Sequence, residues 1–131
     1  MEKYRNEDGT CRYCGSLPSQ EHASTCELGK VTRQHDKITG EVFAETINQL
    51  RQWDIQDHPM GTSTAFAVQR DLVRQRTDNH AKEGRLTWAD ILDEEYYETL
   101  AEIDPVAMEE EAIQTAAVLV SMVAASRRAR A

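Results

Sequence analysis

Two acidic stretches lie on consecutive predicted helices: Glu94-Glu95-Tyr96-Tyr97-Glu98 and Glu109-Glu110-Glu111-Ala112-Ile113-Gln114. Residues three apart share one side of a helix, so Glu95 projects with Glu98, and Glu111 projects with Gln114. Glu95 follows Ile91 by four residues and therefore continues the apolar stripe of its own helix. A charge on such a stripe is costly unless a partner neutralises it. A divalent cation held between the two helices would be such a partner.

The acidic stretches belong to the last two of four predicted helices. Thr87 and Asp90 form a capping box that begins the third helix, and Asp104-Pro105 combines an N-cap with a first-turn proline to begin the fourth. Beyond residue 30 no strand pattern of useful length occurs. The fold class we predict is all-α, an antiparallel four-helix bundle in which the fourth helix is the most buried. The predicted helices span about 30–57, 62–83, 87–103 and 104–130.

Charge is distributed unevenly along the 131 residues, whose net charge is −8. Residues 84–112 carry one basic side chain against ten acidic ones. A surface this acidic repels nucleic acid, which we do not expect as a partner, and it attracts cations. The longest apolar run is too short to span a bilayer and no leader opens the chain, so we expect a cytoplasmic protein with no membrane association.

The N-terminal segment contains all three cysteines of the chain, in the pattern C-x2-C-x7-H-x3-C formed by Cys11, Cys14, His22 and Cys26. Three thiolates and one imidazole are a complete tetrahedral zinc set with no open position, which predicts a structural zinc ion. The alternative is ordinary thiols beside an incidental histidine. The spacing differs from that of nucleic-acid-binding knuckles and the segment is neutral, so nucleic-acid binding is a minor alternative. We predict a zinc-binding, knuckle-like segment over 1–30 and a helical domain over 31–131.

Oxygen ligands on facing helices favour Mg²⁺ or Mn²⁺ over zinc. Such an ion polarises phosphoryl oxygens and acidifies water, which are the requirements of phosphoanhydride hydrolysis. The alternatives are that the acidic helix starts are simply solvated and that the basic residues pair with Asp71 and Asp78 on the surface. The candidate phosphate-binding cations and base-stacking rings are Arg70, Arg74, Lys82, Arg85, Trp53 and Trp88.

Further motifs accompany the acidic ones in a fixed order: Gln52-Trp53-Asp54-Ile55-Gln56-Asp57-His58-Pro59-Met60-Gly61-Thr62, then Gly84-Arg85-Leu86-Thr87-Trp88-Ala89-Asp90-Ile91-Leu92, and after Glu98 the run from Glu111 to Val118. With them, residues 52–125 resemble the MazG-like all-α nucleoside triphosphate pyrophosphohydrolases, in the form seen in actinobacteria and their phages. The resemblance implies a Mg²⁺-dependent enzyme, located in the host cytoplasm if phage-encoded, that releases a monophosphate and pyrophosphate from a nucleoside triphosphate.

The family's metal ligands are E-x-x-E on one helix and E-x-x-D on the next. Glu95 and Glu98 match the E-x-x-E pair. Glu111 matches the glutamate of the E-x-x-D pair, but Gln114 stands at the position of its aspartate. The neutral amide is expected to weaken metal binding, to favour one ion over more, or to leave a binding domain without turnover. Glu94 is a candidate base or a support for the ligands.

Two functions therefore remain open at the level of sequence. One is a nucleotide pyrophosphohydrolase, and the other is a non-catalytic zinc-bearing helical module that binds a nucleotide or a protein partner. The resemblance and the Ala/Val-rich fourth helix favour a homodimer or a higher homo-oligomer, in which a partner chain could complete the active site.

Overall fold

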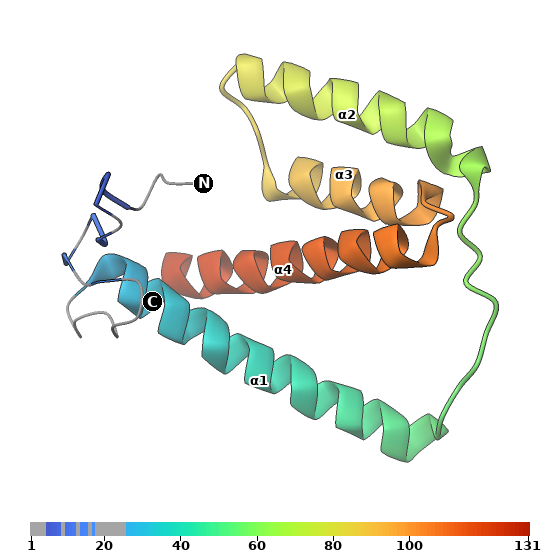
Figure 1. The fold of residues 1–131 in the computed structure, drawn as a ribbon, viewed down its shortest axis with the longest axis horizontal. Coiled ribbons are helices and arrows are strands. Elements are labelled where there is room, and N and C mark those ends of the chain that lie inside the picture. The colour runs from blue at the N-terminus through green and yellow to red at the C-terminus, as the bar shows by residue number, and fades with distance from the viewer. Residues whose placement is uncertain (1–4, 9, 13, 16, 18–25) are drawn as a thin grey trace. The chain divides into compact units, whose positions relative to one another are not determined.

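The computed structural model describes residues 5–8, 10–12, 14–15, 17 and 26–131, and the regular structure of these residues is helical (Figure 1). The described residues contain no strand, and their single β-bridge joins Arg5 to Cys11. The all-α prediction is confirmed. The helices are α1 (Glu27–Trp53), the short 3-10 helix η2 (Thr64–Phe66), α2 (Ala67–Lys82), α3 (Trp88–Ala101) and α4 (Pro105–Ala129).

The chain divides into two compact units, Met1–Gln52 and Trp53–Ala131. The first unit contains the three cysteines and nearly all of α1, and the second contains η2, α2, α3 and α4. The sequence-based division into 1–30 and 31–131 separates the predicted zinc-binding segment from the predicted helices, and it stays a prediction. Among the described residues, no helix is both long enough and apolar enough to cross a membrane.

The helix ends follow from local chemistry. The α1 helix stops at Trp53, earlier than predicted, because Asp54 adopts the left-handed conformation (φ 59°) and its Oδ1 accepts a hydrogen bond from Ile55 N at 2.8 Å. The capping box of α3 is confirmed: Thr87 Oγ1 accepts from Asp90 N at 3.2 Å, and Asp90 Oδ2 accepts from Thr87 N at 3.0 Å. Asp104 caps α4 by accepting from Ala107 N at 2.9 Å. Each such cap contributes about 1 kcal/mol.

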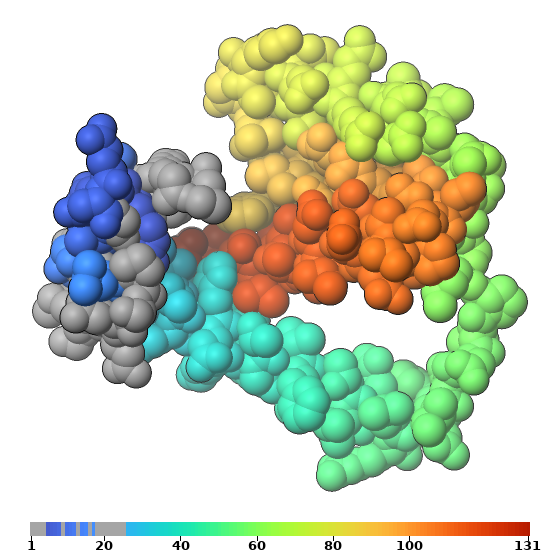
Figure 2. Space-filling model, in the orientation of Figure 1, coloured from blue at the N-terminus to red at the C-terminus, as the bar shows by residue number. Residues whose placement is uncertain are grey.

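In the second unit α3 lies between α2 and α4 and packs against both (Figure 1). The three helices form one continuous body in the space-filling view (Figure 2). The α2 and α3 helices run antiparallel, because Arg74 of α2 contacts Glu98 late in α3, whereas His80, two turns further along α2, contacts Asp90 early in α3. The preceding loop is joined to α3 by Ser63 N, which donates to Leu100 O at 2.9 Å.

The second unit leaves much of its apolar surface exposed. Its buried side chains are small or polar, and the largest aliphatic one is Val73. The prediction that α4 is the most buried helix is wrong: Ala124 is its only buried residue, and Ile113 is 70% exposed. Apolar residues recur along α4 on more than one side of the helix, and α3 packs against only part of them.

Candidate metal centre between α3 and α4

Three carboxylates converge between α3 and α4. Glu95 and Glu98 leave α3 one turn apart, and Glu111 leaves the first half of α4. One carboxylate oxygen from each of the three lies within 4.8 Å of the others, and all three side chains are half-buried. The structure therefore brings together the three glutamates that the spacing singled out.

Two of these carboxylates have an oxygen without a partner. Glu95 Oε2 and Glu111 Oε2 are buried, and neither has a hydrogen-bond partner among the described residues. An unsatisfied buried polar atom costs about 1–3 kcal/mol, and more if it is charged. Mg²⁺ takes carboxylate oxygens as ligands, and an ion held by Glu95 and Glu111 would supply a partner that these carboxylates lack. The residues thus fit the ion that the sequence predicts.

Burial also shifts the protonation of this cluster. The pKa of Glu95 is raised, first by burial and then by the charges of Glu98 and Glu111. The pKa of Glu111 is raised by burial and then by Glu98. The pKa of the adjacent Glu94 is raised by burial and then by Glu98 and Asp78. Each shift favours the neutral acid, and a bound cation would reverse it by stabilising the carboxylate.

Arg74 is the basic residue that reaches this cluster. Its Nε donates to Glu98 Oε1 at 2.8 Å, and this bond is the main reason that the pKa of Arg74 is raised. The Glu98 side chain is 16% exposed and that of Arg74 is 44% exposed, so the pair lies at the rim of the site. Arg74 was predicted to meet phosphates or to pair on the surface, and the structure places it on a predicted metal ligand.

Two threonines join the helices directly beside the carboxylates. Thr99 Oγ1 lies 3.0 Å from Thr115 Oγ1 across α3 and α4. The same hydroxyls contact the backbone oxygens of Glu95 (3.0 Å) and Glu111 (2.9 Å), one turn back on each helix. Each hydroxyl has one proton, so at most two of these three contacts are hydrogen bonds at any one time. The contacts set the α3–α4 register at the turns that carry the ligands. Sequence reasoning missed both residues, although each lies four residues after a predicted ligand.

In the described part of the chain, none of the other predicted substrate residues forms a hydrogen bond or ion pair with the three carboxylates. Arg70 donates from Nε to Asp71 at 3.1 Å, and Arg85 pairs with Glu83. Lys82 ends α2, about 12 Å along the helix from Arg74. Gln114 is exposed on α4, and its role as a ligand stays a prediction. The two tryptophans are both exposed: 40% for Trp88, which begins α3, and 52% for Trp53, which ends α1.

A second polar cluster in this unit was found only in part from the sequence. Asp90 is buried, and its Oδ2 lies 2.9 Å from His80 Nδ1 and accepts from Thr87 Oγ1 at 2.8 Å. Its Oδ1 lies 3.3 Å from Arg76 Nε. The contacts with His80 and Thr87 hold the pKa of Asp90 well below its usual range. The capping box identified Asp90, but the contacts from α2 depend on the helix packing. Asp90 is eight residues, about 12 Å, from Glu98, so this cluster fixes the α2–α3 register from the other end.

The first unit contains the predicted thiol cluster. The Sγ atoms of Cys11, Cys14 and Cys26 lie within 4.8 Å of one another, and the Cys11 and Cys26 sulfurs are 3.9 Å apart. Cys11 and Cys26 are buried, and burial is the first cause of the raised pKa of Cys26. His22, the predicted fourth ligand, lies outside the described residues. The structure therefore places three of the four predicted zinc ligands in one cluster.

Comparison of this chain with protein-family models, with curated proteins and with solved structures gives no match. The similarity to MazG-like enzymes therefore stays a proposal based on the motifs.

Proposed function

We propose that the second unit is a Mg²⁺-dependent nucleotide pyrophosphohydrolase of the MazG-like type, converting a (d)NTP or related nucleotide to a monophosphate and pyrophosphate. The observation that carries the proposal is the pair of buried, unpartnered oxygens, Glu95 Oε2 and Glu111 Oε2, beside Glu98. Neither atom has a hydrogen-bond partner among the described residues, which is uncommon for buried polar atoms and which a bound cation would explain. Mn²⁺ has the same ligand preference and is the alternative ion.

The charges on the residues favour a single ion. Three carboxylates and the guanidinium of Arg74 together carry a net charge of −2, which one divalent cation neutralises. An aspartate at position 114 would add a further negative charge and call for more metal. Gln114 instead offers a neutral amide oxygen on the same helix, three residues after Glu111. The departure from the family pattern is thus consistent with a one-ion site.

The roles of the chain's own residues follow from this arrangement. When bound, Mg²⁺ supplies charge that polarises a phosphoryl oxygen and acidifies water. Glu95, Glu98 and Glu111 would hold the ion. Glu94 has a raised pKa and is the candidate base that accepts the proton of the attacking water. Arg74 uses Nε on Glu98 and has further guanidinium N–H donors that could bind a phosphate.

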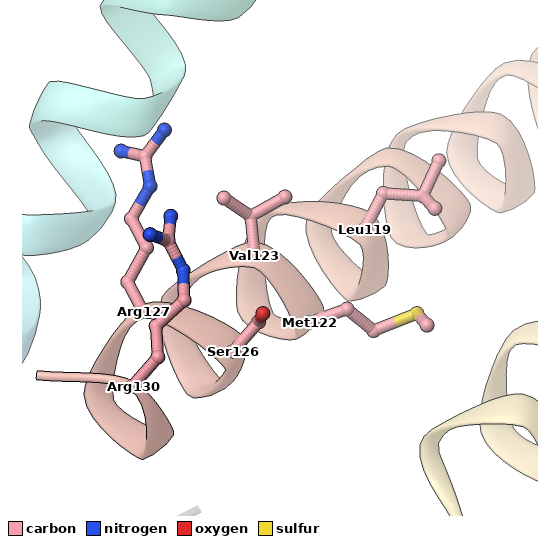
Figure 3. A pocket seen from close by; sticks show the side chains of 6 residues that line it. All are labelled: Leu119, Met122, Val123, Ser126, Arg127 and Arg130. Atoms are coloured by element: carbon pink, nitrogen blue, oxygen red, sulfur yellow. The ribbon is translucent and has the colours of Figure 1, made fainter.

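A homodimer and a complete four-helix bundle belong to the same proposal. They are supported by large apolar side chains that the second unit leaves exposed on α2 and α4, among them Val68, Leu72 and Ile113. Further along α4, Leu119, Met122 and Val123 line one hollow together with Ser126, Arg127 and Arg130 (Figure 3). A second copy would remove such side chains from water. Light scattering of the purified chain tests this directly, and a monomer at micromolar concentration would contradict it.

A non-catalytic nucleotide- or protein-binding module is the second candidate, and one contact favours it. Arg74 already pairs with Glu98, one of the three proposed ligands, and Gln114 lacks the family's charge. A site arranged in this way could bind a nucleotide through its cations without turning it over.

Pyrophosphate release separates the two candidates. Purified protein with Mg²⁺ or Mn²⁺ and a panel of NTPs and dNTPs should release pyrophosphate, and both Glu95→Gln and Glu98→Gln should abolish the release. The matched control is Glu110→Gln, an exposed glutamate next to Glu111. Full activity of Glu98→Gln would refute the metal site. Inactivity of the wild type on every nucleotide, with nucleotide binding retained, would favour the binding module.

A further inference from the structure

The thiol cluster lies in the first unit, so its role is independent of the hydrolase proposed for the second. We propose that Cys11, Cys14 and Cys26 bind one zinc ion, and that this ion replaces an apolar core in the first unit and holds the start of α1. The proposal thus concerns a zinc-dependent folding unit whose failure would leave the carboxylate site unaffected.

The sulfur positions fit a shared metal ion. Tetrahedral zinc with Zn–S bonds of about 2.3 Å places two bound sulfurs about 3.8 Å apart. The Cys11 and Cys26 sulfurs are 3.9 Å apart, and Cys14 Sγ lies within 4.8 Å of both. A disulfide would need about 2.0 Å. Three thiolates are soft ligands and select zinc over the magnesium suited to the glutamates.

The backbone around the cysteines has the turn that such a site requires. Gly15 N donates to Cys11 O at 2.8 Å, which closes a turn over the C-x2-C pair. Gly15 has φ 73°, a conformation that side chains disfavour, and glycine adopts it without strain. This turn returns Cys14 toward Cys11, and it matches the two-residue spacing typical of zinc knuckles.

Cys26 connects the cluster to the helix. It directly precedes Glu27, the first residue of α1, and its carbonyl oxygen accepts the first helical hydrogen bond from Lys30 N at 2.8 Å. Fixing Cys26 through its sulfur therefore fixes one end of the first helical turn. Helix nucleation is the unfavourable step of helix formation, and a metal–thiolate bond at this position would promote it.

Few large apolar side chains are buried among the described residues of the first unit. Its buried described residues are Cys11, Cys26, Gly29 and Ile38, so Ile38 is the only large aliphatic side chain among them. Along the rest of α1 the large apolar residues are exposed, for example Phe43 at 67%. Chains of this size with so little apolar burial depend on metals or cross-links. Metal binding in small domains is coupled to folding for this reason.

Binding is balanced by proton release: each thiol that becomes a ligand gives its proton to solvent, and no oxidant is needed. The sequence predicts His22 as the neutral fourth ligand, although that residue lies outside the described part of the chain.

The test uses the full chain, purified without chelator. Native mass spectrometry and elemental analysis should find one zinc per chain, and Cys26→Ser should lose it. Chelation of the wild type should increase amide exchange in α1 by about tenfold or more, and added zinc should restore protection. The α1 helix contributes 27 helical residues, against 16, 14 and 25 for α2, α3 and α4, so loss of α1 removes about a third of the helical circular dichroism signal.

Zinc add-back to the chelated wild type distinguishes loss of metal from a packing defect of the serine variant. Glu98→Gln is the matched control and should keep both its zinc and the protection of α1. A wild type without zinc, a Cys11–Cys26 disulfide in the purified chain, or unchanged α1 exchange after chelation would each overturn the proposal.

Discussion

Replacing Arg74 with glutamine should strengthen Mg²⁺ binding and weaken catalysis. In the structure Arg74 Nε donates to Glu98 Oε1 at 2.8 Å, so an incoming ion competes with the guanidinium for Glu98 and is repelled by its charge. Removing the guanidinium ends both effects. A nucleotide, by contrast, loses a cation that faces its phosphates, which should lower turnover by about tenfold or more. The arrangement therefore predicts that one substitution raises the affinity for Mg²⁺ and lowers the rate of turnover.

The size of the metal effect follows from exposure. A fully buried pair at this distance would interact strongly, but Arg74 is 44% exposed and water screens it. Exposed ion pairs contribute up to about 1 kcal/mol, which corresponds to about fivefold in the dissociation constant. We therefore expect Mg²⁺ to bind the Arg74→Gln variant about fivefold more tightly than it binds the wild type.

Isothermal titration of nucleotide-free protein with MgCl₂ measures this change, and the Mg²⁺-induced rise in melting temperature provides a second measure. The control is Arg70→Gln, which removes the same charge from the same helix. Arg70 pairs with Asp71, which Arg74 Nη1 also approaches at 4.0 Å, but in the described part of the chain only Arg74 pairs with Glu98. Unchanged or weaker Mg²⁺ binding in Arg74→Gln would show that the ion does not use Glu98, and the proposed ligand set would then be wrong.

Four further substitutions, at three places in the second unit, test the remaining contacts. Glu95→Gln should stabilise the metal-free protein at pH 7 by about 1 kcal/mol and abolish stabilisation by Mg²⁺. Because the pKa of Glu95 is raised in the folded protein, its contribution to stability is full below the ordinary value of 4.5 and is lost as pH rises through the folded value. The free energy of unfolding, measured by urea melts across pH 4–8, should therefore change less with pH in this variant. Thr99→Val should cost about 1 kcal/mol, and the double variant with Thr115→Val should cost less than twice that; strict additivity would contradict a shared hydrogen bond. Asp90→Asn should lower the melting temperature at neutral pH and make stability less sensitive to acid, because the lowered pKa of Asp90 supports folding above about 3.8 and that support is lost on acidification.

Much of the second unit follows from local sequence signals. The capping box at Thr87 and the Asp104-Pro105 start are confirmed because caps depend on residues within one turn of each other. The approach of Glu95, Glu98 and Glu111 follows from helical spacing and from a short connection that makes α3 and α4 neighbours. These features need no knowledge of how more distant helices pack.

The contacts that the sequence did not reveal cross between helices. Arg74 meets Glu98 across 24 residues, and the register that allows this depends on Asp90 contacting His80 and Thr77. Nothing within one helix specifies that register. The exposure of Ile113 was missed for a related reason, since periodicity shows which side of a helix is apolar but not whether one chain covers it.

The two candidate centres differ in donor chemistry, and this difference assigns their roles. Three sulfurs with one further predicted ligand leave zinc no open position, so a site built from Cys11, Cys14 and Cys26 would hold structure and perform no reaction. Three glutamate side chains leave a hard cation several positions for water and phosphate. Because the ligands also lie in separate units, chelation of zinc should act on α1 and withdrawal of Mg²⁺ on the α3–α4 site. Sulfur ligands in one unit and oxygen ligands in the other would select different metals, so zinc and Mg²⁺ would not compete for the same centre.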